Sequence, residues 1–165
     1  MTPMFNPGPN PYGVPPILLG ALGPLMTQVA GEVADGLIIH PFNSVPCLQE
    51  NALPAVRKGL DKSARSEDDF IIQVNAIVIT GETDEAYHAA EQSVKGLLGF
   101  YSSTPAYRPP MDAVGLGDLQ PKLNALSKEG KWEQLGNYIN DEFLDAFCVR
   151  GKPEDIAGKL KEQYG

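Results

Sequence analysis

The fold of this 165-residue chain is constrained most strongly by two short apolar runs. A glycine-containing turn and a helical pattern join them. The runs fall at residues 16–21 and 36–41, and their Ile and Leu content is typical of strands buried in a parallel sheet. Between them, Met26, Val29, Ala30, Val33 and Ala34 recur at the spacing of a helix that packs on a sheet. The pattern therefore predicts a strand–helix–strand unit with parallel strands.

The turn after the first run has the composition of an anion-binding helix start. We expect Gly20 and Gly23 to allow unusual backbone dihedral angles and close approach of a ligand, and Pro24 to occupy the first helical position. Proline has no N–H group, so the available donors are those of Leu25 and Met26, where the helix dipole favours an anion. A phosphate site is predicted, although a turn that merely closes a tight connection would have the same composition.

Beyond this turn, the sequence resembles the luciferase-like monooxygenase superfamily, and within it the oxidoreductases that depend on the deazaflavin coenzyme F-420. The resemblance is carried by residues 20–26 and 30–36, by His40-Pro41-Phe42, and by shorter matches at 53–54, 59–60, 68–70, 100–101, 103–107, 130–132 and 141–142. It implies a (β/α)8 TIM barrel that binds a flavin or deazaflavin at the carboxyl ends of its strands. It also implies that the cofactor phosphate is bound by Gly20, Ala21, Leu22, Gly23, Pro24 and Leu25.

The chain is long enough for only part of such a barrel, which takes about 250 residues and rarely fewer than about 200. Three strands are predicted, at 16–21, 36–41 and 70–79, and the resemblance makes them the fifth, sixth and seventh. The eighth is expected beyond the last residue. We therefore expect an α/β fold, a single domain over 1–165 that is the carboxyl-terminal section of a barrel. An irregular lead-in at 1–15 and an irregular, lid-like insertion at 102–131 complete it.

Helices are expected between and after these strands. One covers 46–60 and is kinked or split by Pro54, and another runs from an N-cap at Thr83 to about residue 101. Its His88 is expected to face solvent. Further helices are predicted over 119–126, over 131–147, and from Pro153 onward.

The candidate site residues follow the second predicted strand or lie in the insertion. His40 stands at a carboxyl strand end, where barrel enzymes place active-site groups, and is the catalytic candidate, although it could simply bond a neighbouring carbonyl. The family's own acid–base histidine and carboxylate belong to earlier strands. Asn43, Tyr107 and Arg108 are the other candidates for the substrate pocket; the alternative for Tyr107 and Arg108 is a solvent-facing helix exit.

Composition limits the partners. A formal net charge of −8 argues against nucleic acid or an anionic membrane as the main partner. No apolar run approaches the roughly 20 residues that cross a bilayer, and no signal peptide is evident, so we expect a cytoplasmic protein. Cys47 and Cys148 form no metal-binding pattern and are read as free, buried thiols.

Two functions remain open. In the first, the chain is part of a flavin- or deazaflavin-dependent oxidoreductase or monooxygenase acting on a small molecule, with coenzyme F-420 or alternatively FMN as cofactor. It then supplies the phosphate-binding loop and one side of the substrate pocket. In the second, it is a non-catalytic half-barrel that binds a phosphate-bearing ligand or a complementary half-barrel. Exposed strand edges predict a homo-oligomer or a partner that supplies the missing half.

Overall fold

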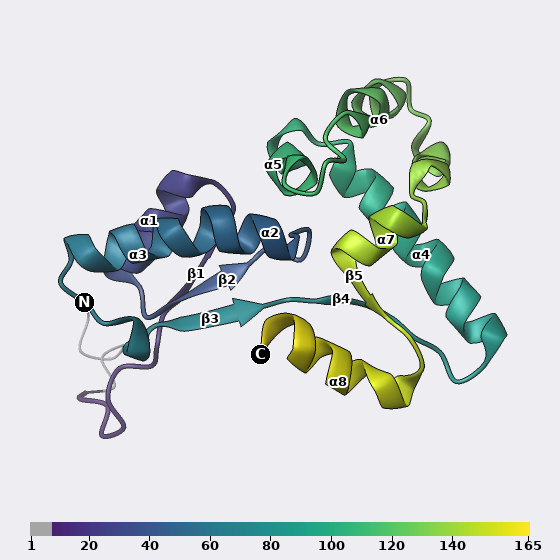
Figure 1. Ribbon diagram of the computed structural model, residues 1–165. Coiled ribbons are helices and arrows are strands. Elements are labelled where there is room, and N and C mark those ends of the chain that lie inside the picture. Colours follow the sequence, from purple (N-terminus) through teal and green to yellow (C-terminus); the bar gives the residue numbers. More distant parts are fainter. Residues whose placement is uncertain (1–7) are drawn as a thin grey trace.

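The computed structural model describes residues 8–165, in which two small parallel sheets follow one another (Figure 1). Strands β1 (Leu18–Ala21), β2 (Gly36–Ile39) and β3 (Ile71–Val74) form the first sheet in the order β1-β2-β3. Strands β4 (Ile77–Ile79) and β5 (Cys148–Arg150) pair in parallel to form the second. The predicted α/β architecture with parallel strands is present.

The strand predicted over residues 70–79 is divided between the two sheets. Its first half, β3, pairs with β2, and its second half, β4, pairs with β5. The break falls at Asn75 and Ala76, and the Asn75 side chain donates from Nδ2 to the Ile39 carbonyl at 3.4 Å. The interruption thus marks the place where the chain leaves the first sheet and enters the second.

A further parallel strand, β5, corrects the prediction that the next strand would lie beyond residue 165. It consists of three residues, follows a helix without an intervening turn, and ends in a charged side chain, Arg150. Such a short segment carries no alternation or apolar run that sequence patterns could detect. The chain therefore occupies four successive strand positions rather than three.

Helices α1 (Pro24–Val33) and α3 (Leu53–Lys62) lie along the same face of the three-stranded sheet (Figure 1). The predicted buried stripe of α1 is partly wrong, because Met26 is 52% exposed and Val33 71% exposed. The helix is turned so that smaller residues are buried, namely Thr27, Ala30, Gly31 and, at its end, Ala34.

Two glycines explain the orientation of α1. A Cβ atom on Gly31 would meet the Val56 carbonyl oxygen, and one on Gly59 would meet the Gln28 carbonyl oxygen. The backbones of α1 and α3 approach closely only because both positions lack a side chain. The backbone contact between α1 and α3, and not hydrophobicity alone, determines which face of α1 is buried.

The helix predicted over 46–60 is split as expected. It comprises α2 (Val45–Cys47), a π-helical turn at Leu48–Ala52, and α3, with Pro54 in the first turn of α3. Proline cannot donate to the preceding turn, so the wider π turn accommodates it.

Helix α4 (Asp84–Ser102) begins as predicted, with the Thr83 hydroxyl accepting from the Ala86 N–H at 3.1 Å. The segment that follows, predicted to be an irregular insertion over 102–131 apart from a helix over 119–126, is largely helical. It contains a 3-10 turn at Pro105–Tyr107, α5 (Arg108–Asp112) and α6 (Leu119–Lys128). The helix predicted over 119–126 is confirmed as α6, and the part before it, predicted to be irregular, also contains helical turns. The Ser103 carbonyl accepts from the amides of Gln120 (3.3 Å) and Asn124 (2.9 Å), which ties α6 to the end of α4.

The single helix predicted over 131–147 is also divided. A 3-10 segment covers Trp132–Tyr138, and α7 (Asp141–Phe147) begins after Asn140, whose side chain accepts from the Phe143 N–H at 3.0 Å. A strong N-cap in the middle of the pattern starts a new helix. The last helix, α8 (Pro153–Tyr164), begins at its proline as predicted.

The buried residues form two clusters. One joins α1 and α3 to β2 and contains Ala30, Leu37, Ile39, Val56 and Leu60. The other surrounds Phe42, which stacks on Phe147 with ring centroids 4.5 Å apart, and extends through α4, α5 and α7. Within residues 8–165, no helix is long and apolar enough to cross a membrane. Both cysteines are free and buried, and His88 is exposed, as predicted.

Candidate functional site

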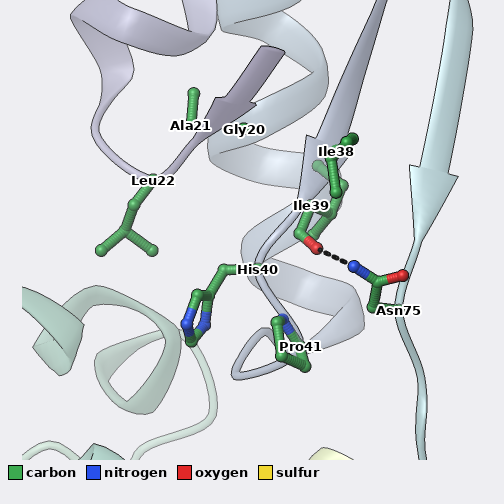
Figure 2. A pocket seen from close by; sticks show the side chains of 8 residues that line it. All are labelled: Gly20, Ala21, Leu22, Ile38, Ile39, His40, Pro41 and Asn75. Atoms are coloured by element: carbon green, nitrogen blue, oxygen red, sulfur yellow. Dashed lines mark hydrogen bonds between the residues drawn. The ribbon is translucent and has the colours of Figure 1, made fainter. Parts of the chain in front are cut away.

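A pocket of about 380 Å³ opens at the carboxyl ends of β1, β2 and β3. Figure 2 shows Leu22 and His40 facing one another across the space beyond the strands, with Asn75 bonded to the Ile39 carbonyl at the far side. The lining residues are Gly20, Ala21, Leu22, Ile38, Ile39, His40, Pro41 and Asn75. Parallel strands bring their carboxyl ends to one edge, so residues as far apart in the chain as Gly20 and Asn75 meet there.

A second pocket, of about 420 Å³, lies beside the first, because Leu22 lines both. Its walls come from the start of α1, from the segment after β2 with the π-helical turn, and from the 3-10 turn and α5. The lining residues are Leu22, Gly23, Pro24, Thr27, Asn43, Cys47, Asn51, Ala52, Ala106, Pro109 and Pro110. The predicted cofactor loop therefore separates two adjoining pockets.

The predicted role of the loop glycines needs one correction. Gly23 has φ −83° and ψ 155°, and Gly20 also lacks a positive φ, so neither adopts a conformation reserved for glycine. A Cβ atom built on either one meets no described atom within 4 Å. Their contribution is open space above the backbone, where a ligand can approach closely.

The start of α1 is ordered by Thr27, which is 3% exposed and whose hydroxyl donates to the Gly23 carbonyl at 3.0 Å. The N–H groups of Leu25 and Met26 have no intrahelical acceptor, and Pro24 has no N–H group. The Leu25 side chain is 78% exposed and lines neither pocket. What this residue can offer a ligand is its backbone.

His40 has a partner at each ring nitrogen. Nδ1 accepts from the Phe42 N–H at 3.1 Å, and Nε2 lies 3.3 Å from the Tyr107 hydroxyl. The Tyr107 ring stacks on the imidazole at 4.7 Å, and the Tyr101 ring meets it edge-on at 5.1 Å. Burial lowers the pKa of His40 below its ordinary value, which keeps the ring neutral near pH 7.

Asn43 and Arg108 lie in different surroundings. Asn43 lines the second pocket, and its Oδ1 atom is buried without a hydrogen-bond partner among the described residues. Arg108 lines neither pocket; its Nε lies 3.2 Å from Asp112 Oδ1, and a second nitrogen lies 3.9 Å from Asp118. His40 and Asn43 thus each line a pocket that the loop borders, while Tyr107 lines neither pocket and reaches the site through its contact with His40. Arg108 faces acidic groups.

The insertion is held to the site by a contact that sequence reasoning missed. Ser44 is 2% exposed, and its hydroxyl donates to the Pro110 carbonyl at 3.0 Å while accepting from the Cys47 N–H at 3.4 Å. This bond joins residues 66 positions apart, so no local pattern announces it. It explains why Ala106, Pro109 and Pro110 contribute to the second pocket.

Charged residues gather away from the two pockets. Among the residues that the structure describes, no Asp, Glu, Lys or Arg lines either of them. The acids of α7 instead bind Arg150, with Asp141 at 2.9 Å and Asp145 at 2.7 Å, and the guanidinium lowers the pKa of Asp141. Within residues 8–165 no cluster of three or more His, Cys, Asp or Glu is arranged to hold a metal ion.

Comparison with known proteins identifies the family of this chain. A model of the luciferase-like monooxygenase family matches residues 1–165. The chain belongs to this family. The predicted membership is thereby confirmed for the whole sequence, including the loop at 20–25 and the insertion.

The similar proteins include an uncharacterized protein and a reductase. An uncharacterized protein of Mycobacterium tuberculosis is 44% identical over 163 residues, which cover 99% of this chain and 48% of that protein. A 5,10-methylenetetrahydromethanopterin reductase of Archaeoglobus fulgidus is 28% identical over 159 residues, covering 96% of this chain and 46% of the reductase. The chain spans about half the length of the curated relatives that it matches.

A solved structure supports the fold. The coenzyme F-420-dependent tetrahydromethanopterin reductase from Methanopyrus kandleri aligns with a TM-score of 0.70 and 21% sequence identity. The alignment covers 90% of this chain and 41% of the reductase. The predicted fold class, part of a luciferase-like TIM barrel, is confirmed.

Proposed function

We propose that this chain supplies the cofactor-phosphate site and one wall of the substrate pocket in a deazaflavin-dependent oxidoreductase. The observation that carries the proposal is the N-terminus of α1, which opens between two pockets at the carboxyl edge of the sheet, below open space over Gly20 and Gly23. Coenzyme F-420 is preferred to FMN because a structural neighbour is described as dependent on it.

The residues present fit a phosphate-bearing cofactor. The N–H groups of Leu25 and Met26 would bind the phosphate, with the helix dipole as the source of attraction, since charged side chains lie elsewhere. The unpartnered Oδ1 of Asn43 would accept from a ligand hydroxyl. When bound, a deazaflavin supplies hydride transfer. The chain's own residues bind and orient it and exclude water.

The substrate side of the proposal involves His40, Asn43, Tyr107 and Arg108. His40 and Asn43 each line one of the two pockets, and Tyr107 contacts His40; Arg108 would reach a ligand only after leaving Asp112. The substrate itself would be a small molecule. The cytoplasmic location stays a proposal, and the ordinary globular composition, with 42% hydrophobic and 21% charged residues, is compatible with it.

A non-catalytic half-barrel is the second candidate, and a specific observation favours keeping it. Leu25, Met26 and Val33 expose 78%, 52% and 71% of their surfaces on α1, and β1 is an edge strand that pairs only with β2 among the described residues. An exposed apolar helix face together with a free strand edge suits association with another half-barrel or with a second copy. Phosphate binding would persist in such a module without turnover.

Cofactor titration tests the proposal. Coenzyme F-420 and FMN are titrated into the purified chain and followed by fluorescence, with Gly23→Ala as the site variant and Gly96→Ala as its control. A Cβ atom at either position meets no described atom within 4 Å, but Gly96 lies on an exposed part of α4. We expect the wild type and the control to bind coenzyme F-420 equally, and Gly23→Ala to weaken binding at least about tenfold.

Four results would discriminate between the two candidate functions and no site at all. A folded wild type that binds neither cofactor contradicts the proposal, as does equal binding by Gly23→Ala. Binding with reduction of the coenzyme supports the oxidoreductase. Binding without turnover under every substrate tried, together with a dimer or a captured half-barrel, supports the non-catalytic module.

A further inference from the structure

We infer that Tyr107, and not His40, presents the exchangeable proton to the ligand at this site, and that His40 is a positioning residue for the tyrosine hydroxyl. The inference rests on the proposed function and names the chemistry that the pocket wall would recognise: a carbonyl oxygen or an unprotonated ring nitrogen. The assignment of the proton follows from the hydrogen-bond partners of the two His40 ring nitrogens.

The tautomer of His40 is fixed by its own loop. The Phe42 N–H group can only donate, so the Nδ1 atom that lies 3.1 Å away must carry a lone pair. In a neutral imidazole the proton is then on Nε2. Phe42 is fully buried and stacks on Phe147, so this backbone donor is held in place by the core.

The proton on Nε2 determines what the tyrosine does. Nε2 lies 3.3 Å from the Tyr107 hydroxyl oxygen and donates to it. The hydroxyl therefore acts as an acceptor toward His40, and its own proton is left for another partner. A hydroxyl that accepts one hydrogen bond is also a better donor in the second. His40, by contrast, has no nitrogen left for a ligand.

Ring packing fixes the direction of this hydroxyl. The Tyr107 ring lies nearly parallel to the imidazole, with an interplanar angle of 25°, and Tyr101 meets both rings edge-on at angles of 77° and 82°. Three rings that contact one another restrict rotation of each side chain. The hydroxyl is thus preorganised, and a ligand would not have to order it.

Tyr107 itself lines neither pocket, and it is placed beside both of them by its neighbours. His40 lines the pocket at the strand ends, while Ala106 and Pro109, on either side of Tyr107 in the chain, line the second pocket. A donor at this junction selects a ligand that offers an acceptor there. A ligand that offers only donors would leave the hydroxyl proton unpaired, which is costly in a desolvated site.

Four variants test the inference, with coenzyme F-420 and FMN as the probes. Tyr107→Phe removes the donor, and Tyr101→Phe is the control, because it removes a hydroxyl from a neighbouring ring in the same cluster. His40→Asn keeps an acceptor for the Phe42 N–H, since an Asn side chain makes the same local bond, but does not reach Tyr107. The double variant His40→Asn with Tyr107→Phe completes a cycle.

The expected results are specific. Tyr107→Phe weakens binding of the probe about tenfold, the loss of one hydrogen bond, whereas Tyr101→Phe stays within about twofold of the wild type. His40→Asn also weakens binding, and the double variant is no weaker than Tyr107→Phe alone. Such non-additivity is expected of residues that act in series, and a merely structural role for His40 would give additive losses.

A second readout needs no ligand. Long-range proton–nitrogen NMR of the wild type should show His40 protonated at Nε2 and unprotonated at Nδ1. A proton on Nδ1 overturns the inference. So does equal binding by Tyr107→Phe and Tyr101→Phe in a wild type that binds the probe, and that result leaves the proposed function standing. Failure of the wild type to bind either probe overturns both.

Discussion

Replacing Gly59 by alanine perturbs the helix pair that positions the site. Helix α1 carries the proposed phosphate-binding N–H groups, and its closest neighbour is α3, which contains Gly59. A Cβ atom there would meet the Gln28 carbonyl oxygen and lie 3.0 Å from the Glu32 nitrogen. Both are backbone atoms, so they cannot rotate away, and the two helices have to separate.

The magnitude follows from two opposing effects. Overpacking of a well-packed contact costs about 1–3 kcal/mol, and the rigid backbone puts Gly59→Ala at about 3 kcal/mol. Replacing glycine by alanine inside a helix returns about 1 kcal/mol, so the net loss of unfolding free energy is about 2 kcal/mol. The control Gly96→Ala has the helix gain without the clash and should gain about 1 kcal/mol.

Urea unfolding followed by circular dichroism measures both variants against the wild type. The account requires Gly59→Ala to unfold at a lower urea concentration and Gly96→Ala at the same or a higher one. A Gly59→Ala protein as stable as Gly96→Ala would refute the argument that backbone contact between α1 and α3 selects the buried face.

Three further predictions concern the site's supports. Ser44→Ala leaves the Pro110 carbonyl without its buried partner and should lower the unfolding free energy by about 1–3 kcal/mol in the same urea assay. Burial lowers the pKa of His40 in the folded protein below the ordinary 6.5 of the unfolded chain. At a pH between the folded and the unfolded pKa, the unfolded state therefore binds more protons than the folded state. Stability should fall as pH drops through that window, and His40→Asn should abolish this part of the fall. Burial raises the pKa of Cys148 to about 12, so a thiol reagent should modify it only after denaturation; rapid modification of the native protein would contradict its burial.

The sequence was informative where local chemistry decides structure. The apolar runs around residues 17–19 and 37–39, the Thr83 cap and the proline starts of α1 and α8 all mark elements that are present. Local patterns failed where tertiary contacts decide. Met26 and Ala30 are both apolar on α1, and only the approach of Gly31 to α3 determines which one is buried.

In the candidate site, too, local sequence indicated some features, and others depend on tertiary contacts. The strand-end position of His40 predicted a place in the substrate pocket, and the residue lines the cavity at the strand ends because parallel strands place their carboxyl ends together. Its role toward a substrate stays a prediction. Its bond to Tyr107 joins residues 67 positions apart and depends on a helical insertion that was expected to be irregular. No spacing rule links the two, so the geometry of the pair required the structure.

The central claim is that a phosphate is bound by the start of α1, and amide NMR of the labelled chain during titration with coenzyme F-420 tests it most directly. The account predicts that the backbone N–H signals of Leu25 and Met26 move most, and that Gly23→Ala suppresses the movement. Binding that leaves these two signals in place, or that shifts instead the amides at the start of α4, would contradict it.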